Sequence, residues 1–411
     1  MKISIPYKKT SIDVEIPNEH FGAILELNEP QKTTSKDPVQ LTKKAIEKSF
    51  DAFMAIPGSV LVIVNDATRP TPTRYVLDAI GPALEKAKAS FLIATGAHRA
   101  PTREEYDFIL GPWYDVFKER VYAHDAYDMS NMKYYGSTKR GTELYLNKLV
   151  AQAQKVIVIG SVEPHYFAGY TGGRKAFLPG TAGYISIEQN HKLALSDDAH
   201  TLALEGNPVH EDMMEAVELI KAPIYSIMTV LDKKHQIDSV CAGSLKASFE
   251  NAIASANAIF TVPLSQKADI VVTSVSYPMD INLYQSQKAI DNGSLALKDG
   301  GTMILVSSCR DGIGGDAFYK LLSSALTPNE VMKKIAQGYK LGYHKAAKMV
   351  NVFKRANVQA YTELDDNQLE NIFITPVHNL QEALDKAILK YGENSKVVFI
   401  PDGSVTVPLV E

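Results

Sequence analysis

Residues capable of proton transfer and nucleophilic chemistry gather in a glycine-rich segment near the middle of the chain. Residues 163–175 read EPHYFAGYTGGRK and lead to a Pro-Gly pair at 179–180. His165 stands near the start of this segment and Lys175 at its end. Glycines at 169, 172 and 173 predict backbone that approaches a ligand closely, because no side chain intervenes. By itself the pattern is equally typical of a glycine-rich surface loop with a solvated lysine.

Buried strands are expected to position this segment and two others. Three apolar runs end abruptly in polar residues, at 60–64, 91–94 and 156–160. Helical patterns follow the first two, and such alternation predicts a parallel α/β sheet. Ligands bind beyond the carboxyl ends of strands in such sheets. The polar side chains expected to converge there are Asp66, Arg69, His98, His165 and Lys175.

The predicted fold class is α/β, with two α/β domains, parallel-type sheets and an active site in the cleft between them. A chain of 411 residues is long enough for two domains. A second strand–helix–strand pattern begins near residue 268, so the first domain is placed at 1–262 and the second at 263–396. The tail 397–411 is treated as a segment able to pack back onto the first domain.

Composition narrows the class of protein. The hydrophobic fraction is 45% and the charged fraction 22%, which is ordinary for a globular enzyme. A net charge of −4 without basic runs disfavours nucleic acid or anionic membranes as partners. No signal-peptide pattern and no stretch of membrane-span length stand in the sequence. With only Cys241 and Cys309, no disulfide framework is expected, and the expected location is cytoplasmic.

Taken together, the motifs resemble those of the nickel-pincer-nucleotide-dependent lactate racemases. The matching motifs are Asp-x-Thr-Arg-Pro-x-Pro at 66–72, Gly-x-His at 96–98, the loop 163–180, Asn-His at 190–191 and Tyr-Gln-Ser-Gln-Lys at 284–288. They span more than half of the chain in the family's order. The resemblance implies a racemase or epimerase of a 2-hydroxy acid, either lactate or a related 2-hydroxy carboxylate.

The resemblance also implies the chemistry. The hydrogen on C2 is too weakly acidic for a side-chain base, so the family removes it as a hydride, to a nickel-bearing pyridinium nucleotide, and leaves a 2-keto acid. Return of the hydride to the opposite face gives the other enantiomer. Two bases must then handle the hydroxyl proton, and His98 and His165 are the implied pair. Dedicated cofactor-synthesis enzymes are implied as maturation partners.

The implied cofactor is the Ni(II)-pyridinium-3,5-bisthiocarboxylic acid mononucleotide, joined covalently to Lys175. His191 is the implied protein ligand to nickel. The nucleotide seat corresponds to the run Asp66, Ala67, Thr68 and Arg69 before a helix start, where phosphate is favoured. Arg69 can serve the phosphate or the substrate carboxylate, and the sequence leaves both open.

Three residues of the second half correspond to the substrate-binding part of the motif. Gln285 and Lys288 are three apart and therefore share one face of the predicted helix. Lys288 would counter the charge of the substrate carboxylate, and Tyr284 is expected to line the same pocket.

Two other functions remain open at this stage. Residues 312–317 read GIGGDA, which satisfies the dinucleotide pattern Gly-x-Gly-x-x-Gly/Ala, and an NAD-dependent 2-hydroxy-acid dehydrogenase is the alternative enzyme. A non-catalytic hydroxy-acid sensor is the other, although binding alone needs no pair of bases. A phosphate loop is excluded at Lys175, because Arg174 and Ala176 replace the glycine and the Ser/Thr that the motif requires.

Overall fold

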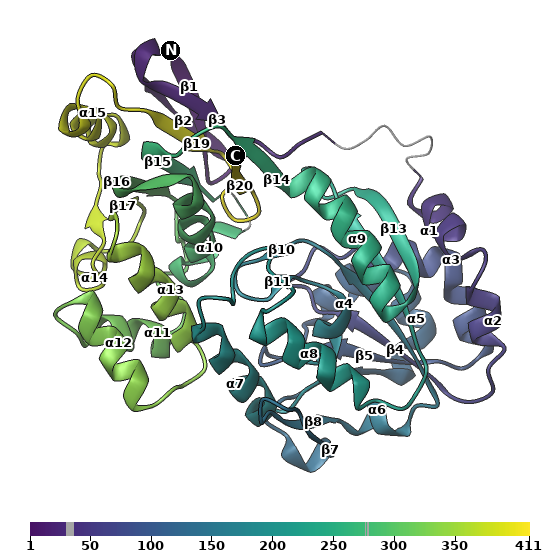
Figure 1. Ribbon diagram of the computed structural model, residues 1–411. Coiled ribbons are helices and arrows are strands. Elements are labelled where there is room, and N and C mark those ends of the chain that lie inside the picture. The colour runs from purple at the N-terminus through teal and green to yellow at the C-terminus, as the bar shows by residue number, and fades with distance from the viewer. Residues whose placement is uncertain (30–36, 276, 278) are drawn as a thin grey trace. The chain divides into compact units, whose positions relative to one another are not determined.

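The computed structural model describes residues 1–29, 37–275, 277 and 279–411 of the chain. They form two compact units (Figure 1). Unit 1 consists of Met1–Asn28 together with Phe260–Glu411, and unit 2 of Glu29–Ile259. Among the described residues, no helix has the length and apolar character that crossing a membrane requires.

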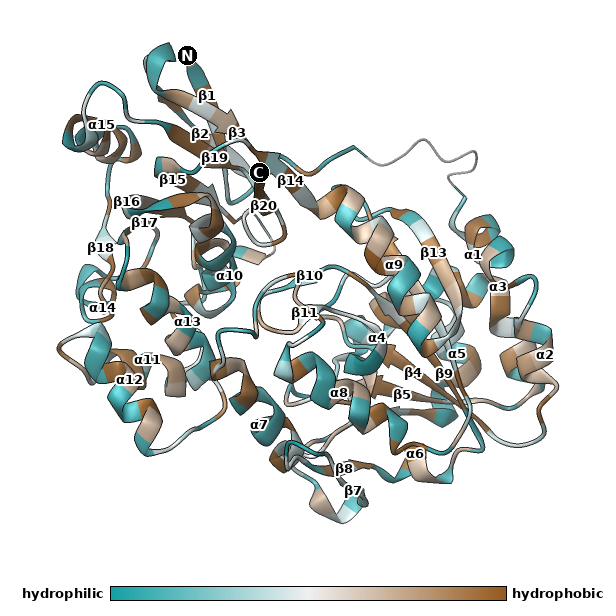
Figure 2. Cartoon of the chain, in the orientation of Figure 1, coloured by the Kyte–Doolittle hydropathy of each residue, from teal (hydrophilic) through white to brown (hydrophobic). Residues whose placement is uncertain are grey.

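A six-stranded sheet forms the centre of unit 2, in the order β13-β12-β9-β4-β5-β6. All neighbours are parallel except the edge strand β13, which is antiparallel to β12. The strands are β4 (Val60–Asn65), β5 (Ser90–Ala94), β6 (Val121–Ala123), β9 (Lys155–Ser161), β12 (Ile224–Leu231) and β13 (Ile237–Ser244). The inner strands are nearly continuous runs of buried Val, Ile and Leu (Figure 2), as expected for a sheet covered on both faces.

Helices and short hairpins surround this sheet. Val76, Leu77 and Ile80 of one helix, α3, pack in the same buried cluster as the sheet residues Val62 and Phe91. The helices are α1 (Pro38–Ile46), α2 (Phe50–Met54), α3 (Thr73–Lys86), α4 (Arg103–Leu110), α5 (Trp113–Phe117), α6 (Lys148–Gln152), α7 (Tyr184–Lys192), α8 (Pro208–Glu218) and α9 (Leu245–Phe260). The antiparallel pairs are β7 (Met132–Ser137) with β8 (Glu143–Asn147) and β10 (Pro164–His165) with β11 (Gly169–Tyr170).

Unit 1 contains a second six-stranded sheet, in the order β18-β17-β16-β15-β19-β3, and every neighbouring pair is parallel. Its strands are β3 (Phe21–Ile24), β15 (Ala268–Ser274), β16 (Leu297–Val306), β17 (Asn357–Tyr361), β18 (Thr375–Pro376) and β19 (Val397–Ile400). Two further pairs are the antiparallel β1 (Lys2–Tyr7) with β2 (Thr10–Glu15) and the parallel β14 (Thr261–Leu264) with β20 (Val407–Val410). The helices are α10 (Leu283–Gly293), α11 (Asp316–Ser323), α12 (Pro328–Gln337), α13 (Tyr343–Phe353), α14 (Asp366–Glu370) and α15 (Leu380–Tyr391).

The predicted α/β class with parallel-type sheets is confirmed, but residues 1–28 lie in the other unit from the one predicted. Residues 1–28, assigned to the first domain, belong to unit 1, because β3 pairs with β19 and Ile3 and Ile5 join the core around Val272. The tail 397–411 stays in unit 1 as well, since β19 also pairs with β15 and β20 with β14. The pairing of β3 with β19 joins segments near the two ends of the chain, and local sequence patterns carry no information about it.

Candidate active site

Three neighbouring strands of unit 2 deliver the predicted site residues to one edge of the sheet. β4 lies between β5 and β9, with Asn65 opposite Ala94 and Val64 opposite Ile159. The segments beginning at Asp66, Thr95 and Val162 therefore leave the sheet side by side. Their contacts, described next, bring Asp66 to His98 and Arg69 to Glu163.

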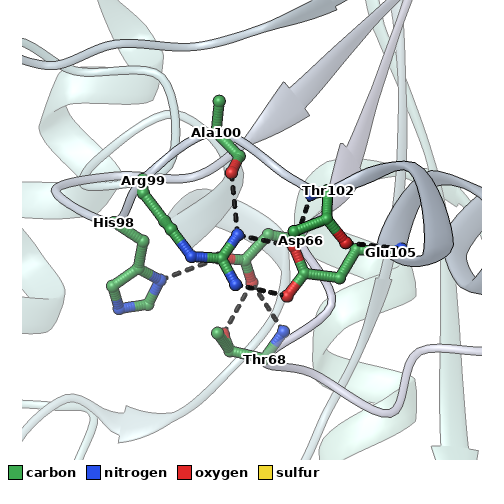
Figure 3. Close-up of polar contacts among 7 residues, drawn as sticks. All are labelled: Asp66, Thr68, His98, Arg99, Ala100, Thr102 and Glu105. Atoms are coloured by element: carbon green, nitrogen blue, oxygen red, sulfur yellow. Dashed lines mark hydrogen bonds and ion pairs between the residues drawn. The ribbon is translucent and has the colours of Figure 1, made fainter.

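Asp66 and His98 form a hydrogen-bonded pair (Figure 3). The Nδ1 atom of His98 lies 2.7 Å from Oδ2 of Asp66, whose side chain is 8% exposed against 57% for the histidine. The other carboxylate oxygen accepts the Thr68 hydroxyl at 2.6 Å and the Thr68 backbone N–H at 3.2 Å. Asp66 is thus held inside the protein while the imidazole extends outward.

The carboxylate of this pair determines which nitrogen of the neutral histidine carries the proton. Burial alone would raise the pKa of Asp66, but the hydrogen bond and charge of His98, the Thr68 hydroxyl and the charge of Arg69 together hold that pKa below its usual value. An ionised carboxylate only accepts, so Nδ1 of His98 carries the proton that it donates. In the neutral ring, Nε2 then holds a lone pair and can accept a proton.

The residue after His98 anchors this turn to a helix (Figure 3). The Arg99 guanidinium makes a bidentate pair with Glu105, at 2.7 and 2.8 Å. Glu105 also completes a capping box with Thr102 at the start of α4. Exposed ion pairs contribute little to the free energy of folding. A bidentate pair to a capped helix nevertheless restricts the position of the turn that carries His98.

His165 lies on β10 and is 8% exposed. The backbone N–H of Ala168 donates to its Nδ1 at 3.3 Å. In the neutral ring the proton then sits on Nε2, which is the opposite assignment to that of His98. The two histidines therefore present complementary neutral forms at Nε2, a lone pair at His98 and an N–H hydrogen-bond donor at His165.

Phe167 is the common neighbour of three predicted site residues. Its ring centroid lies 4.6 Å from that of His165, 5.1 Å from that of His191 and 5.3 Å from the Lys175 amine nitrogen. The sequence placed Lys175 and His191 sixteen residues apart and indicated no role for Phe167. The buried phenylalanine, 2% exposed, gathers them around one apolar surface.

His191 stands near the end of α7 and is a neutral nitrogen donor. Burial of the ring, with the charge of Lys175, lowers its pKa to about 3. A neutral imidazole is the form that binds a metal. The preceding Asn190 is fully buried and donates to Asp212 at 2.8 Å, which ties α7 to α8. Among the described residues no group of three or more His, Cys, Asp or Glu could hold a metal ion.

The glycine-rich loop is packed against the protein itself. Gly169 has φ of 74°, and a Cβ atom there would lie 2.1 Å from the carbonyl oxygen of Ala203. Asn207, the N-cap of α8, donates to the Phe167 carbonyl at 2.9 Å, and the Tyr170 hydroxyl donates to Asn257 of α9 at 2.5 Å. The sequence predicted that these glycines let backbone approach a ligand. At Gly169 the close approach is instead to the chain's own backbone.

Glu163 is a site residue to which the sequence indicated no role. Its carboxylate accepts from Nη1 of Arg69 at 3.2 Å, and both side chains are partly buried. The pair ties the turn after β4 to the start of the glycine-rich loop. Ala67, the other member of the predicted nucleotide seat, is half-buried and packs against the core of unit 2.

In unit 1 the three predicted substrate residues share one face of α10. Tyr284, Gln285 and Lys288 are partly exposed, whereas Ser286 and Gln287 between them are fully buried. The buried Lys345 of α13 donates to the Tyr284 carbonyl at 2.5 Å, and its amine lies 3.7 Å from the centre of the tyrosine ring. The predicted single-face arrangement of Gln285 and Lys288 is present.

The glycines that resemble a dinucleotide fingerprint pack around the start of α10. The Tyr284 N–H donates to the Ile313 carbonyl at 2.9 Å. A Cβ at Gly314 would lie 2.3 Å from the Asn282 side chain, and one at Gly315 would lie 2.9 Å from the Tyr284 ring. Close packing against Asn282 and Tyr284 therefore accounts for two of these glycines.

Comparison with known proteins adds independent findings. Residues 7–203 match the family model of the lactate racemase N-terminal domain, and residues 264–407 match that of the lactate racemase C-terminal domain. A lactate racemase of Thermoanaerobacterium thermosaccharolyticum is 33% identical over 419 residues, covering 98% of this chain and 97% of the relative. A lactate racemase of Lactiplantibacillus plantarum is 30% identical over 422 residues, covering 98% of each.

Two solved structures resemble the structure of this chain. The lactate racemase apoprotein of T. thermosaccharolyticum superposes with a TM-score of 0.91 at 31% identity, over 100% of both chains. A Thermotoga maritima protein gives a TM-score of 0.70 over 93% of this chain and 100% of its own, at 15% identity. The second likeness concerns the fold alone.

The Asp66–His98 pair predicts a measurable tautomer. In apoprotein labelled with ¹⁵N-histidine, and at a pH high enough for the ring to be neutral, His98 should carry its proton at Nδ1. Asp66→Asn should shift the ring toward the Nε2-protonated form, since an amide can donate to Nδ1. Thr68→Val is the matched control, because it removes a bond to the other carboxylate oxygen. An unchanged His98 signal in Asp66→Asn would contradict the assignment.

A second prediction concerns acid stability. The pKa of His191 and that of His210 are both lowered to about 3, in each case chiefly by burial. The unfolded chain binds these protons from about pH 6.5 downward. The free energy of unfolding of unit 2 should therefore fall between about pH 6.5 and 3, by about 1.4 kcal/mol per pH unit for each histidine. Urea titrations following Trp113, the single tryptophan, measure this slope, and His191→Phe should reduce it by about one proton. An unreduced slope would contradict the lowered pKa of His191.

Proposed function

Because this chain belongs to the lactate racemase family, a family of isomerases, we propose that it interconverts the enantiomers of lactate or a closely related 2-hydroxy carboxylate. The observation that carries the proposal is the pair of histidines in complementary forms. Nε2 of His98 carries a lone pair that can accept a proton, and Nε2–H of His165 can donate a hydrogen bond to an oxygen. A non-catalytic sensor needs no such pair, and the racemase function accounts for both.

His98 is proposed to take the proton of the substrate hydroxyl. Asp66 supports this step, since its carboxylate stabilises the imidazolium that forms and keeps the ring oriented. His165 is proposed to return a proton to the oxygen on C2 from the other side, through Nε2. For this step the ring must be the imidazolium, with Nδ1 also protonated and no longer accepting from Ala168, because a neutral imidazole is too weak an acid to give up its N–H. For the reverse direction the two rings exchange roles. Positioned proton transfer of this kind contributes on the order of 10²- to 10⁴-fold to a rate.

Lys175 and His191 fit the residues that would hold a nickel-pincer nucleotide. Lys175 would join it covalently through the amine, and the neutral His191 would give one nitrogen ligand to the nickel. When bound, this cofactor would supply a hydride acceptor for the hydrogen on C2. The run from Asp66 to Arg69 would seat the nucleotide, and cofactor-synthesis enzymes would deliver it.

Substrate recognition is assigned to α10. Lys288 would pair with the substrate carboxylate, and Gln285 would donate a hydrogen bond to the substrate. Tyr284 would line the binding site, and Lys345 holds the tyrosine in place. The alternative, an NAD-dependent dehydrogenase, rested on the glycines at 312–315. Two of these glycines have an explanation in packing, and the family match supports the racemase.

Intact mass tests the cofactor assignment. Protein co-expressed with cofactor-synthesis enzymes should carry a modified pyridinium mononucleotide on Lys175 and about one nickel per chain. Lys175→Ala should lose the adduct and the activity but keep its fold, because the side chain is only partly buried. Lys192→Ala, which removes an exposed lysine of α7, is the control and should keep the adduct. An adduct on another lysine would overturn the assignment.

Isotope labelling tests the chemistry. We expect α-deuterated lactate of one configuration, racemised in ordinary water, to retain its deuterium in the product enantiomer, because His98 and His165 handle only the hydroxyl proton. Mass spectrometry of the separated enantiomers measures the retention. Extensive loss of deuterium to water would mean that the histidines remove the C2 hydrogen as a proton, and the proposed roles of Lys175 and His191 would be wrong.

A further inference from the structure

Arg174, next to Lys175, is a completely buried arginine, with 0% exposure. Its guanidinium donates to three backbone carbonyls of the glycine-rich loop, those of Ala168 at 2.6 Å, Gly172 at 3.3 Å and Thr171 at 3.5 Å. Among the described residues no carboxylate pairs with it. A buried charge without a counter-ion is costly, so the surrounding groups must stabilise it.

Two kinds of group do so. Carbonyl oxygens present the negative ends of their dipoles, and hydrogen bonds to a charged donor are stronger than those between neutral groups. The face of Phe249, on α9, lies 4.4 Å from the guanidinium carbon, a distance typical of a cation–π contact. The His210 ring lies against the same phenylalanine, at 6.2 Å between centroids. Burial and the charge of Arg174 keep this histidine neutral, with a pKa of about 3.

The position of the three carbonyls along the chain is informative. They belong to residues 168, 171 and 172, which lie between His165 and Lys175. A guanidinium is planar and rigid, so three bonds from one group set the relative orientation of these peptide units. A lysine amine is a point charge on a flexible stem and would not impose the same geometry.

We propose that Arg174 is a positioning residue that fixes the loop backbone from Ala168 to Gly172, and thereby holds His165 and Lys175 in place around Phe167. The consequence for cofactor attachment rests on the proposed function. The clamp itself is a property of the apoprotein. Lys175 directly follows the clamp, so a loose loop would displace its amine, and a displacement of about 1 Å at a reacting group can cost about 10²-fold in rate.

Hydrogen–deuterium exchange on the apoprotein tests the clamp. In Arg174→Lys and Arg174→Met, the amides of Tyr170, Thr171 and Lys175 should exchange about tenfold faster or more, because local opening becomes easier. Amides of the central strand β9 should keep their wild-type protection. Leu84→Ala, a core truncation in α3, is the control for general destabilisation and should not single out the loop. Wild-type loop exchange in Arg174→Lys would overturn the proposal, as would an equal increase in β9.

Chemical rescue separates positioning from bulk packing. In Arg174→Ala, millimolar guanidinium chloride should restore the protection of the loop amides, whereas equimolar sodium chloride should not. Failure of guanidinium in a folded variant counts against the clamp. With cofactor-synthesis enzymes present, Arg174→Lys should carry about tenfold less adduct on Lys175 per folded chain. If wild-type protein also lacks the adduct, the proposed function has failed, while the exchange result still decides the role of Arg174.

Discussion

Parallel pairing of β4 with β5 and β9 is the constraint on which the site of unit 2 depends. Hydrogen bonds between these strands align their carboxyl ends, so the segments that follow leave the sheet together. Asp66 then meets His98, and Arg69 meets Glu163, across sequence separations of 32 and 94 residues. An antiparallel arrangement of the same strands would send neighbouring ends to opposite edges.

Backbone rigidity is the second requirement of this site. Gly169 has a positive φ, a backbone conformation that favours glycine. The Ala203 carbonyl occupies the space where a side chain would be. Three side chains then hydrogen-bond to the glycine-rich loop: Asn207 at the start of α8, Asn257 on α9, and Arg174 within the loop itself. A loop held by so many directed bonds keeps His165 and Lys175 in place before any ligand arrives, so less ordering entropy is lost on binding.

The proton positions on three histidines follow from their local surroundings rather than from residue type. Three histidines of this region are distinguished by their hydrogen-bond partners and surroundings. His98 faces a carboxylate and solvent, His165 accepts from a backbone N–H, and His191 lies beside a lysine in an apolar place that lowers its pKa to about 3. The same side chain therefore has three different hydrogen-bonding and electrostatic environments within one unit.

The sequence by itself determined the α/β class, the strand ends that carry chemistry and the identity of the family. Strands such as those at 60–64 and 156–160 can be predicted from the sequence, because a strand buried on both faces of a parallel sheet consists of continuous apolar residues. The motif residues can be recognised because they match the family's motifs in type and order. Tertiary structure alone decided that Asp66 orients His98, that Phe167 gathers three site residues and that β3 pairs with β19. These are contacts between residues far apart in the chain. The local pattern of apolar and polar residues does not specify which distant residue a side chain or strand edge will contact.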